Sequence, residues 1–377
     1  MVNSFHLDGV KAFNEHHYEI AKDSFLQAVD KNPELAESYF YLGKCYFFCN
    51  EMQLAISSLN KFIELKQNTS DEIANAYYAF DLLGQCYEAE NNDAAALKCY
   101  ETATEINPAG ASAWHSIGLL YIKFALHDLE TDLEQSNHFF KEAKTFLQKA
   151  LEICSDHPVF LQSIASWYEQ YIEVLKRTFE DENAIQKKIA INFSDAIQYY
   201  RKALSGCHEQ DLALRNIILS NLTECLAQYG HHWYKNNDYK KAQATYLEAL
   251  HLDPEHLIVI NQIGMSFFKQ DCFFEARQYF YCILEKTEDK QEIADAWLNI
   301  ACTHRLEKEW NKAGEALNKA KLLAPEDSFI TEEEMKLNES KLATLLISAP
   351  QTLFGNSNTE PHDTGNKIVE KSIFQPN

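Results

Sequence analysis

Two histidine pairs are the first groups in this sequence that could do chemistry, because neutral imidazole nitrogens bind zinc and other transition metals. They are His16-His17 and His231-His232. Adjacent residues point in different directions rather than toward one ion, and no H-E-x-x-H motif or cluster of cysteine and histidine accompanies either pair. We therefore predict surface polar residues at His16 and His17, and no metal site at either pair.

Thiols and carboxylates also occur in groups. Cys45 and Cys49 are spaced so that they share one face of a helix, and Glu332, Glu333 and Glu334 could act as paired carboxylates. We expect small, buried or half-buried thiols in the first case and a solvated first helical turn in the second. The ten cysteines contain no C-x2-C pair, which favours free thiols in a reducing compartment over disulfides.

No catalytic motif joins these residues. The sequence contains no P-loop, no G-x-G-x-x-G and no G-x-S-x-G, so it offers neither a glycine-rich loop for phosphate nor a nucleophile elbow. No nucleophile, base and orienting group are placed so that the sequence would bring them together. The prediction is a protein that is not an enzyme and that uses no cofactor or metal.

Composition indicates which kind of fold must position the remaining side chains. Of the 377 residues, 46% are hydrophobic and 24% are charged, and there are only 11 glycines and 8 prolines. The hydrophobic fraction is sufficient for a sizeable core. Sandwiches, barrels and doubly wound sheets need many more turns with glycine and proline. We therefore predict an all-α protein.

Charge and hydropathy limit the partners and the compartment. The formal net charge is −22, so the average field of the surface would repel nucleic acid and an anionic membrane. No window approaches the roughly 20 apolar residues that a membrane span requires. The first residues contain no basic stretch followed by a long apolar run. We expect a cytoplasmic protein, or one secreted without a cleavable signal peptide.

A block of 34 residues or slightly more returns along the chain. In its second half, alanine, a large apolar residue and a second alanine lie on one helical face, with alanine where another helix comes close. A proline then ends the helix. The matching sets are Ala21, Phe25, Ala28, Pro33; Ala96, Tyr100, Ala103, Pro108; Ala242, Tyr246, Ala249, Pro254; and Ala313, Leu317, Ala320, Pro325.

The first half of the block repeats as an aromatic residue, an apolar residue followed by glycine, and a second aromatic residue. Glycine within a helix costs roughly 1 kcal/mol relative to alanine. Its return at one register predicts two helices that approach too closely for a β-carbon. The examples are Tyr39, Leu42, Gly43, Tyr46; Phe80, Leu83, Gly84, Tyr87; and Trp114, Ile117, Gly118, Tyr121.

These residues resemble the tetratricopeptide repeat, a helix-turn-helix unit that stacks into a right-handed superhelix. The resemblance covers residues 2–327 and implies a right-handed α-solenoid of eight units. The units would begin near residues 2, 36, 77, 111, 158, 223, 257 and 294. Some depart from the pattern, since Gln67 and Glu288 replace the closing proline and Ala165 and Ala301 replace the glycine.

The uneven spacing of the units predicts further helical structure. Extra chain is inserted near residues 122–142 and 169–195, and the second insertion would form a projecting helical hairpin. Residues 211–223 extend the helix before the sixth unit. Residues 328–348 carry an apolar stripe and would cap the last unit, whose core edge needs a cover. Residues 349–377 are rich in Asn, Ser, Thr, Pro and Gly and are expected to form a disordered tail.

By resemblance to the family, the first helix of each unit lines a concave groove, and fixed positions of the unit meet the ligand. This register selects Phe13, Phe40, Tyr41, Phe47, Phe48 and Tyr78 at the amino-terminal end, some of which must be core residues instead. It selects Gln228, His231, Asn261, Gln262, Asn299 and Arg305 at the carboxyl-terminal end. Aromatic side chains would anchor a peptide, and the amides of Asn261 and Asn299 would hold its backbone. The alternative is a wall of solvated polar residues.

One specific site of the family can be tested against the sequence. The clamp for the acidic tail of heat-shock chaperones uses Lys and Asn on one unit, Asn on the next, and Lys and Arg on the third. The first unit has His6 and Val10 at the former positions, and the third has Tyr78 and Leu82 at the latter. No run of three units matches, so a chaperone tail is disfavoured. The negative net charge favours a neutral or basic protein or peptide.

Three functions remain open at this point. The first is a scaffold or adaptor that binds a peptide or a partner helix in the groove, with the inserted hairpin available for a second contact or a homodimer. The second is a secreted bacterial effector or secretion-system chaperone, for which residues 349–377 would serve as an export signal. The third is the substrate-selecting arm of a transferase, for which no catalytic residues are visible.

Overall fold

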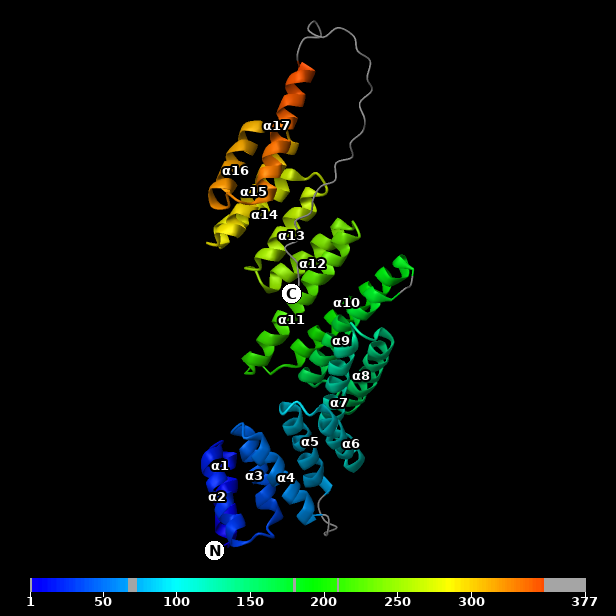
Figure 1. Ribbon diagram of the computed structural model, residues 1–377, viewed down its shortest axis with the longest axis vertical. Helices are drawn as coiled ribbons and strands as arrows, with labels where there is room; N and C mark the ends of the chain where they lie inside the picture. Colours follow the sequence, from blue (N-terminus) through cyan, green and yellow to red (C-terminus); the bar gives the residue numbers. More distant parts are fainter. Residues whose placement is uncertain (1, 67–72, 179–180, 209, 349–377) are drawn as a thin grey trace. The chain divides into compact units, whose positions relative to one another are not determined.

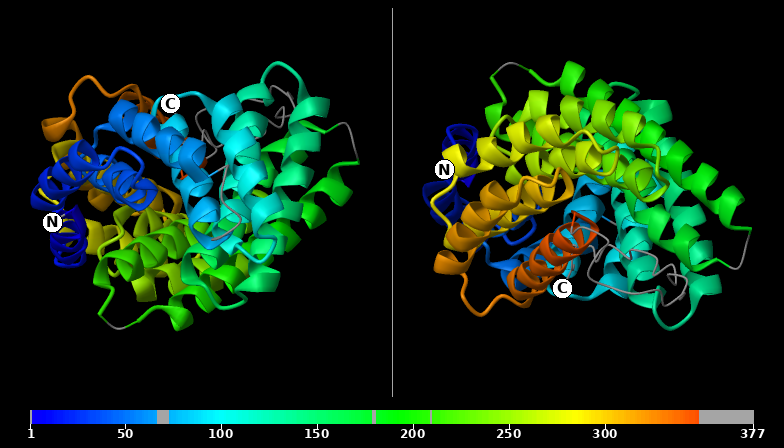
Figure 2. Two further views of the ribbon diagram at one scale, coloured as in Figure 1. Left: turned by 90° about the horizontal axis from the view of Figure 1, so that it is seen from below. Right: turned by 90° about the horizontal axis from the view of Figure 1, so that it is seen from above.

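The structure is a computed structural model that describes residues 2–66, 73–178, 181–208 and 210–348. These residues form 17 helices and, within those ranges, no strand, which confirms the predicted all-α fold. The chain divides into two compact units, Met1–Cys272 and Phe273–Asn377, and each is described by itself. Figures 1 and 2 show that successive helices of a unit pack in pairs.

The first unit contains α1 (Val2–Asn14), α2 (Tyr18–Lys31), α3 (Ala36–Phe48), α4 (Met52–Lys66), α5 (Ile73–Ala89), α6 (Asp93–Ile106), α7 (Ala111–Asp128), α8 (Leu133–Ile153), α9 (Pro158–Arg177), α10 (Glu182–Gly206), α11 (Leu212–Lys235), α12 (Tyr239–Leu252) and α13 (Leu257–Phe268). The second unit contains α14 (Phe273–Lys286), α15 (Lys290–Leu306), α16 (Trp310–Leu323) and α17 (Ser328–Ser348). No described helix is both long enough and apolar enough to cross a bilayer.

Each odd-numbered helix from α1 to α11 packs against the helix that follows it, and in the second unit α15 packs against α16 in the same way. We call the odd-numbered helices from α1 to α15 the first helices and the even-numbered helices from α2 to α16 the second helices. Because a short turn joins the two helices of each pair, they run antiparallel to each other.

Aspartate and asparagine begin several of these helices. The side chains of Asn92, Asp132, Asp181, Asp211 and Asp238 each accept a hydrogen bond from a backbone N–H of the turn that follows. The first amides of a helix have no partner inside it, so such a cap stabilises the helix by about 1 kcal/mol. Asp211 therefore begins α11 well before the sixth unit predicted near residue 223.

The turn that follows a first helix repeats one backbone conformation. His16, Asn50, Asn91, Asn237, Asp271 and Lys308 have positive φ angles between 57° and 62°. Asparagine and aspartate tolerate this left-handed conformation better than other side chains. His16 is exposed and lies at this turn, and its Nδ1 is 2.9 Å from the hydroxyl of Tyr18. It is therefore a turn residue on the surface, as the sequence predicted.

The repeated alanines and large apolar residues form the core between the helices of a pair. Ala96, Tyr100 and Ala103 of α6 are 0% exposed. The corresponding residues of α2, α12 and α16 are at most 3% exposed. Alanine allows neighbouring helices to approach, and the larger residue fills the adjacent space. The packing role predicted for these positions is confirmed.

Gly84 of α5 shows why glycine returns at one register of the first helices. A β-carbon at Gly84 would lie 2.5 Å from Cε1 of Tyr100, whose ring is fully buried. Since the ring is enclosed on all sides, it cannot move away without disturbing its neighbours. The close approach that the sequence predicted is therefore present between α5 and α6.

The predicted insertions fall within long helices and the turns between them. Residues 122–142 include the end of α7 and the first half of α8, and residues 169–195 include the end of α9 and the first half of α10. The residues of α17 are those of the predicted cap, and α17 packs against α15 and α16. The predicted tail, 349–377, lies outside the described residues. The division into eight units, and their continuity across Cys272 and Phe273, remain predictions.

Substitution of glycine by alanine should have opposite effects at two positions. Gly84→Ala should destabilise the first unit by about 1–3 kcal/mol, because its β-carbon meets the buried ring of Tyr100. Gly314→Ala is the matched control, since nothing lies within 4 Å of that β-carbon, and it should stabilise α16 by about 0.5–1 kcal/mol. Hydrogen exchange of α5 and α16 measures both effects. Equal changes at the two sites would contradict the packing described.

Candidate interaction face of the first helices

The first helices of the first unit form a row. α1 packs against α3, α3 against α5, α7 against α9, and α11 against α13. A hydrogen bond from Ser112 of α7 to Asp81 of α5 joins those two helices, and Cys225 of α11 lies close enough to Glu169 of α9 to lower the pKa of that acid. We call this row, from α1 to α13, the first-helix face. The family register assigns the ligand contacts to this face.

Three of the six aromatic candidates have different surroundings. Phe40 is only 6% exposed and packs against the ring of Phe62, with centroids 5.2 Å apart, so it is a core residue rather than a peptide anchor. Tyr41 is half-buried and stacks on the ring of Phe25 at 5.3 Å. Tyr78 is 58% exposed and is the candidate best placed to contact a partner.

A lysine that sequence reasoning missed lies among these rings. The Nζ atom of Lys44 is 4.8 Å from the ring centroid of Phe13, 5.4 Å from that of Phe40 and 5.5 Å from that of Tyr41. Burial lowers the pKa of Lys44. The negative faces of aromatic rings attract a cation, so the three rings hold this ammonium group.

The polar candidates of α11 take part in side-chain contacts within the unit. Gln228 is exposed, and its amide donates to Glu224 at 3.1 Å. Glu224 also lies 3.9 Å from Nε2 of His256 in an ion pair, and this neighbour lowers the pKa of Glu224. His231 is half-buried, with its ring parallel to that of Tyr234 at 6.3 Å. Gln228 therefore lies beside an acidic side chain of α11, and His231 lies against a ring of the same helix.

The amide candidates fall in both units. Asn261 and Gln262 lie half-buried on α13 in the first unit, and Asn299 lies half-buried on α15 in the second. Asn261 and Asn299, the proposed pair, therefore lie in different units. A joint role for the two amides stays a prediction.

Arg305 is paired inside the second unit. Its Nε lies 2.5 Å from Oε1 of Glu333, and its Nη2 lies 3.3 Å from Oε2 of the same residue. Glu333 is 5% exposed, so the expectation that the acidic run at its position is fully solvated is wrong for this residue. The periodicity of α17 turns Glu333 toward α15, and the two-point pair attaches α17 to that helix.

Asp81 was not singled out from the sequence, although it lies on the same helix as Tyr78. It is 7% exposed, and its Oδ2 accepts hydrogen bonds from Ser112 at 3.1 Å and from Gln85 at 3.3 Å. Burial raises the pKa of Asp81. Within the described residues, no group donates to its Oδ1.

A histidine and a serine join the next two first helices. The Nε2 atom of His115 on α7 is 2.8 Å from Oγ of Ser163 on α9. Burial lowers the pKa of His115 to about 4, so the imidazole is neutral near pH 7. His115 therefore adds a hydrogen bond to the first-helix face and no positive charge.

Two tyrosines of second helices donate to carboxylates of first helices. The Tyr100 hydroxyl donates to Glu88 of α5 at 2.9 Å, and the Tyr200 hydroxyl donates to Glu169 of α9. Burial raises the pKa of Glu169 to about 7. Each aromatic ring thus fills the core of its pair while its hydroxyl satisfies an acid on the opposite helix.

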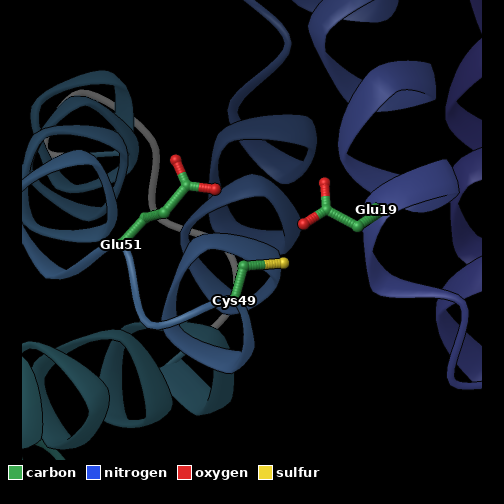
Figure 3. Close-up of side chains that lie close together, drawn as sticks. All are labelled: Glu19, Cys49 and Glu51. Atoms are coloured by element: carbon green, nitrogen blue, oxygen red, sulfur yellow. The ribbon is translucent and has the colours of Figure 1, made fainter.

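One cluster in the first unit has the spacing of metal ligands. Glu19, Cys49 and Glu51 converge where α2 begins and α3 ends, and the Cys49 sulfur faces the Glu19 carboxylate (Figure 3). Lys22 bonds to both carboxylates, at 2.6 Å to Glu19 and 2.7 Å to Glu51. Because this ammonium group already bonds to both acids, the cluster is better explained as an ion-pair network.

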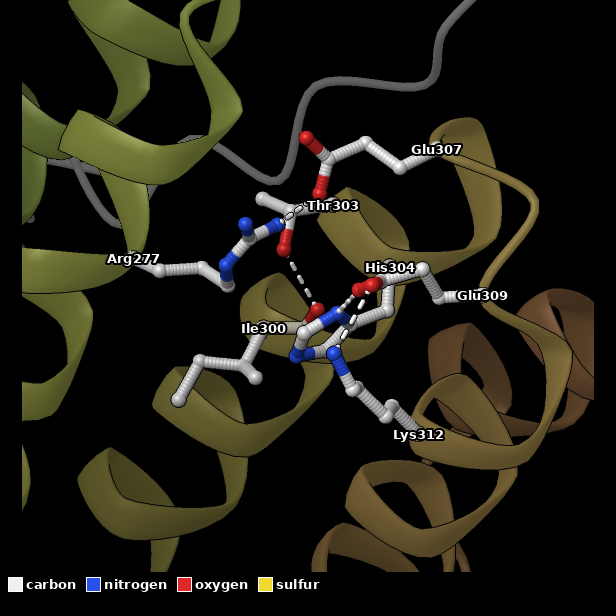
Figure 4. Close-up of polar contacts among 7 residues, drawn as sticks. All are labelled: Arg277, Ile300, Thr303, His304, Glu307, Glu309 and Lys312. Atoms are coloured by element: carbon white, nitrogen blue, oxygen red, sulfur yellow. Dashed lines mark hydrogen bonds and ion pairs between the residues drawn. The ribbon is translucent and has the colours of Figure 1, made fainter.

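A second such cluster lies in the second unit (Figure 4). Nδ1 of His304 is 2.6 Å from Oε2 of Glu309, and Lys312 pairs with the other oxygen at 2.7 Å. Arg277 pairs with Glu307. Here each of the two carboxylates is paired with a different cation, so this cluster is also better explained as an ion-pair network that joins α14, α15 and the turn after α15.

The raised pKa of Glu169 predicts a pH-dependent stability. The folded state favours the protonated acid, so stability is highest below the ordinary value of 4.5 and is lost as the pH rises to about 7. The change is about 3 kcal/mol at most. Glu169→Gln keeps an acceptor for Tyr200 and should remove this dependence from hydrogen exchange in α9 and α10. Tyr200→Phe should move the transition to higher pH. Parallel profiles in all three proteins would refute the assignment.

The pair between Arg305 and Glu333 predicts how α17 is held. Glu333→Ala leaves a largely buried guanidinium without its partner, which should destabilise α17 by about 3 kcal/mol or more and accelerate its hydrogen exchange. Glu334→Ala is the matched control, since this exposed pair with Lys321 should contribute about 1 kcal/mol or less. Similar exchange in the two variants would show that the buried pair does not anchor the helix.

One family model and one sequence relative are similar to parts of this chain. A family model described as a tetratricopeptide repeat matches residues 36–69 and 77–109. Anaphase-promoting complex subunit 3 of Schizosaccharomyces pombe (strain 972 / ATCC 24843) is 23% identical over 144 residues, which span 38% of this chain and 19% of that protein.

Several solved structures resemble the chain at low sequence identity. A MamA protein is 19% identical and the match covers 53% of this chain and 92% of that one, with a TM-score of 0.40. A tetratricopeptide repeat protein of the thermophile Thermus thermophilus is 19% identical, with 59% and 99% covered and a TM-score of 0.41. The matched segments include the helix pairs α3–α4 and α5–α6, so these two pairs are similar to the tetratricopeptide repeat.

Proposed function

We propose that the chain is a non-catalytic scaffold that binds a segment of a partner protein on its first-helix face, within the groove that the family register predicts. Tetratricopeptide repeat proteins are generally protein-interaction scaffolds. The proposal goes further because it assigns the contact to particular side chains of this chain. The side chain that we expect to contribute most to this contact is that of Tyr78.

The exposure of Tyr78 carries the proposal. Its ring is 58% exposed, whereas the neighbouring Tyr77 is 3% exposed and packs into the core. Asp81 lies one helical turn after Tyr78 on α5 and bonds to two further polar residues, Gln85 of α5 and Ser112 of α7. Exposed aromatic residues with a polar rim are the side chains that most often anchor a protein partner.

The helices that present Tyr78 are fixed before any partner binds. The backbone N–H of Ala113 on α7 donates to the Tyr77 hydroxyl of α5 at 3.3 Å. The ring of Tyr77 also lies where a β-carbon at Gly110 would be, which keeps the start of α7 close to α5. Because these helices are already ordered, little conformational entropy of the receptor opposes binding.

Charge favours a partner with basic side chains. The chain carries a net charge of −22, and the first-helix face includes the carboxylate of Glu224, whose pKa is lowered by His256. Complementary charge increases the rate of encounter and selects among partners. A basic or neutral segment therefore fits this face better than an acidic one.

A photocrosslinking amino acid at position 78 tests the proposal. Replacing Tyr78 with p-benzoylphenylalanine should give a discrete crosslink to one segment of a partner protein, because the exposed ring lies at the contact. The matched control is the same replacement at Tyr281, a tyrosine of the second helix α14 that is 38% exposed. Equal crosslinking at both positions would contradict binding at the first-helix face. A crosslink from position 78 to a second copy of the chain would contradict the adaptor role and show instead that this face forms a homodimer.

A further inference from the structure

Asp81 is a buried carboxylate whose hydrogen bonds are unevenly divided. Both of its donors, the Ser112 hydroxyl and the Gln85 amide, bond to Oδ2. No group in the described part of the chain donates to Oδ1, although the residue is only 7% exposed. Burying a carboxylate oxygen without a donor is unfavourable, so the arrangement needs a reason outside the unliganded chain.

No positive charge compensates Asp81 in the described residues. The two groups that bond to it are a hydroxyl and an amide, and the nearby Tyr77 and Tyr100 carry neutral hydroxyls. His115 on the neighbouring helix is neutral near pH 7, as shown above. Buried carboxylates in proteins are usually paired with a cation. The Oδ1 atom of Asp81 can still accept a hydrogen bond from a cation, and the described residues supply none.

Other charged side chains of the first-helix face differ in this respect. Lys44 is enclosed by three aromatic rings. Glu169 accepts a hydrogen bond from Tyr200. Glu224 is paired with His256. Each of these charges has partners within the chain, which leaves Asp81 as the best candidate to receive a charge from another molecule.

The residues around Asp81 would allow a cation to enter. Gln85 is half-buried and its bond to Oδ2 is the longer of the two, at 3.3 Å, so its amide can be exchanged for another donor. A guanidinium or ammonium group in its place could bond to both carboxylate oxygens. Tyr78 precedes Asp81 by one helical turn on the same side of α5, where its exposed ring could lie against the cation.

We propose that Asp81 and Tyr78 form the receiving site for one arginine or lysine side chain of the partner segment. The inference rests on the proposed function and names the chemistry of the partner, a basic residue that inserts between α5 and α7. Arginine fits better than lysine, because its planar fork can bond to both oxygens of Asp81 at once.

NMR titration of the full-length chain tests the site without knowledge of the partner. The probes are N-acetyl-arginine methylamide and N-acetyl-citrulline methylamide, which have similar shapes but differ in charge. The Gln85 side-chain amide resonances report on occupancy, because this amide must move when the probe binds. We expect saturable shifts with the arginine probe and none with the citrulline probe. Equal shifts with both probes, or no shift with either, would overturn the inference.

Three variants assign the effect to particular side chains. Asp81→Asn should weaken binding of the arginine probe by about tenfold or more, since the charged acceptor is lost. Tyr78→Ala removes only an exposed ring and should weaken it about two- to fivefold, which keeps the test valid if the first variant folds poorly. Glu101→Gln on α6 removes one exposed carboxylate elsewhere and should leave the affinity unchanged. Unchanged affinity in Asp81→Asn and Tyr78→Ala would refute the site.

The outcome can be separated from that of the proposed function. A crosslink from position 78 to a partner protein, with no binding of the arginine probe, would refute the cation site alone. Binding of the arginine probe that depends on Asp81, with no crosslink to a partner, would support the cation site and count against the scaffold.

Discussion

Tyr100 of α6 rests against Gly84 of α5 at a separation that leaves no room for a β-carbon, and the rest of the first unit depends on contacts of this kind. A large apolar side chain of the second helix meets a small residue of the first helix, while alanines such as Ala96 and Ala103 let the next helix approach. Dispersion contacts at this density fix the two helices of a pair in one register. Each pair then offers its neighbour a defined surface on which to pack.

This packing determines which side chains remain available on the first-helix face. Most of the largest fully buried side chains lie on second helices, among them Phe140, Tyr100 and Tyr200, and first helices carry polar groups that these side chains can reach. The hydroxyls of Tyr100 and Tyr200 extend through the core and bond to Glu88 and Glu169. Acids are thereby held half-buried on the face at little cost in unsatisfied hydrogen bonds. Asp81 is the exception, and its incomplete bonding is what distinguishes it as a binding group.

The sequence was sufficient to predict the elements that repeat. Ala96, Tyr100 and Ala103 are enclosed as expected, since a residue type that returns at a fixed register must face the same surroundings in each unit. Tyr78, selected from the sequence as a peptide-binding residue, lies exposed on a first helix, and its role in binding stays a prediction. These predictions needed only the periodicity of one helix pair.

The features that depend on contacts between particular helices could not be predicted in this way. Phe40 shares the register of exposed positions but packs on Phe62, because a neighbouring helix covers it. Arg305 bonds to Glu333 only because α17 turns that residue, and not Glu334, toward α15. A helical register predicts the face of the helix on which a side chain lies. It does not predict which side chains of the adjacent helix contact that face.

Hydroxyl-radical footprinting of the chain, alone and in complex with the partner captured at position 78, tests the central claim most directly. The method reports the solvent exposure of individual side chains. The account predicts that Tyr78 and Phe48, which are exposed on first helices, become protected in the complex. Leu54 and Leu247, which are exposed on second helices, should react as before. Protection of Leu54 and Leu247 with Tyr78 and Phe48 unchanged would contradict binding on the first-helix face.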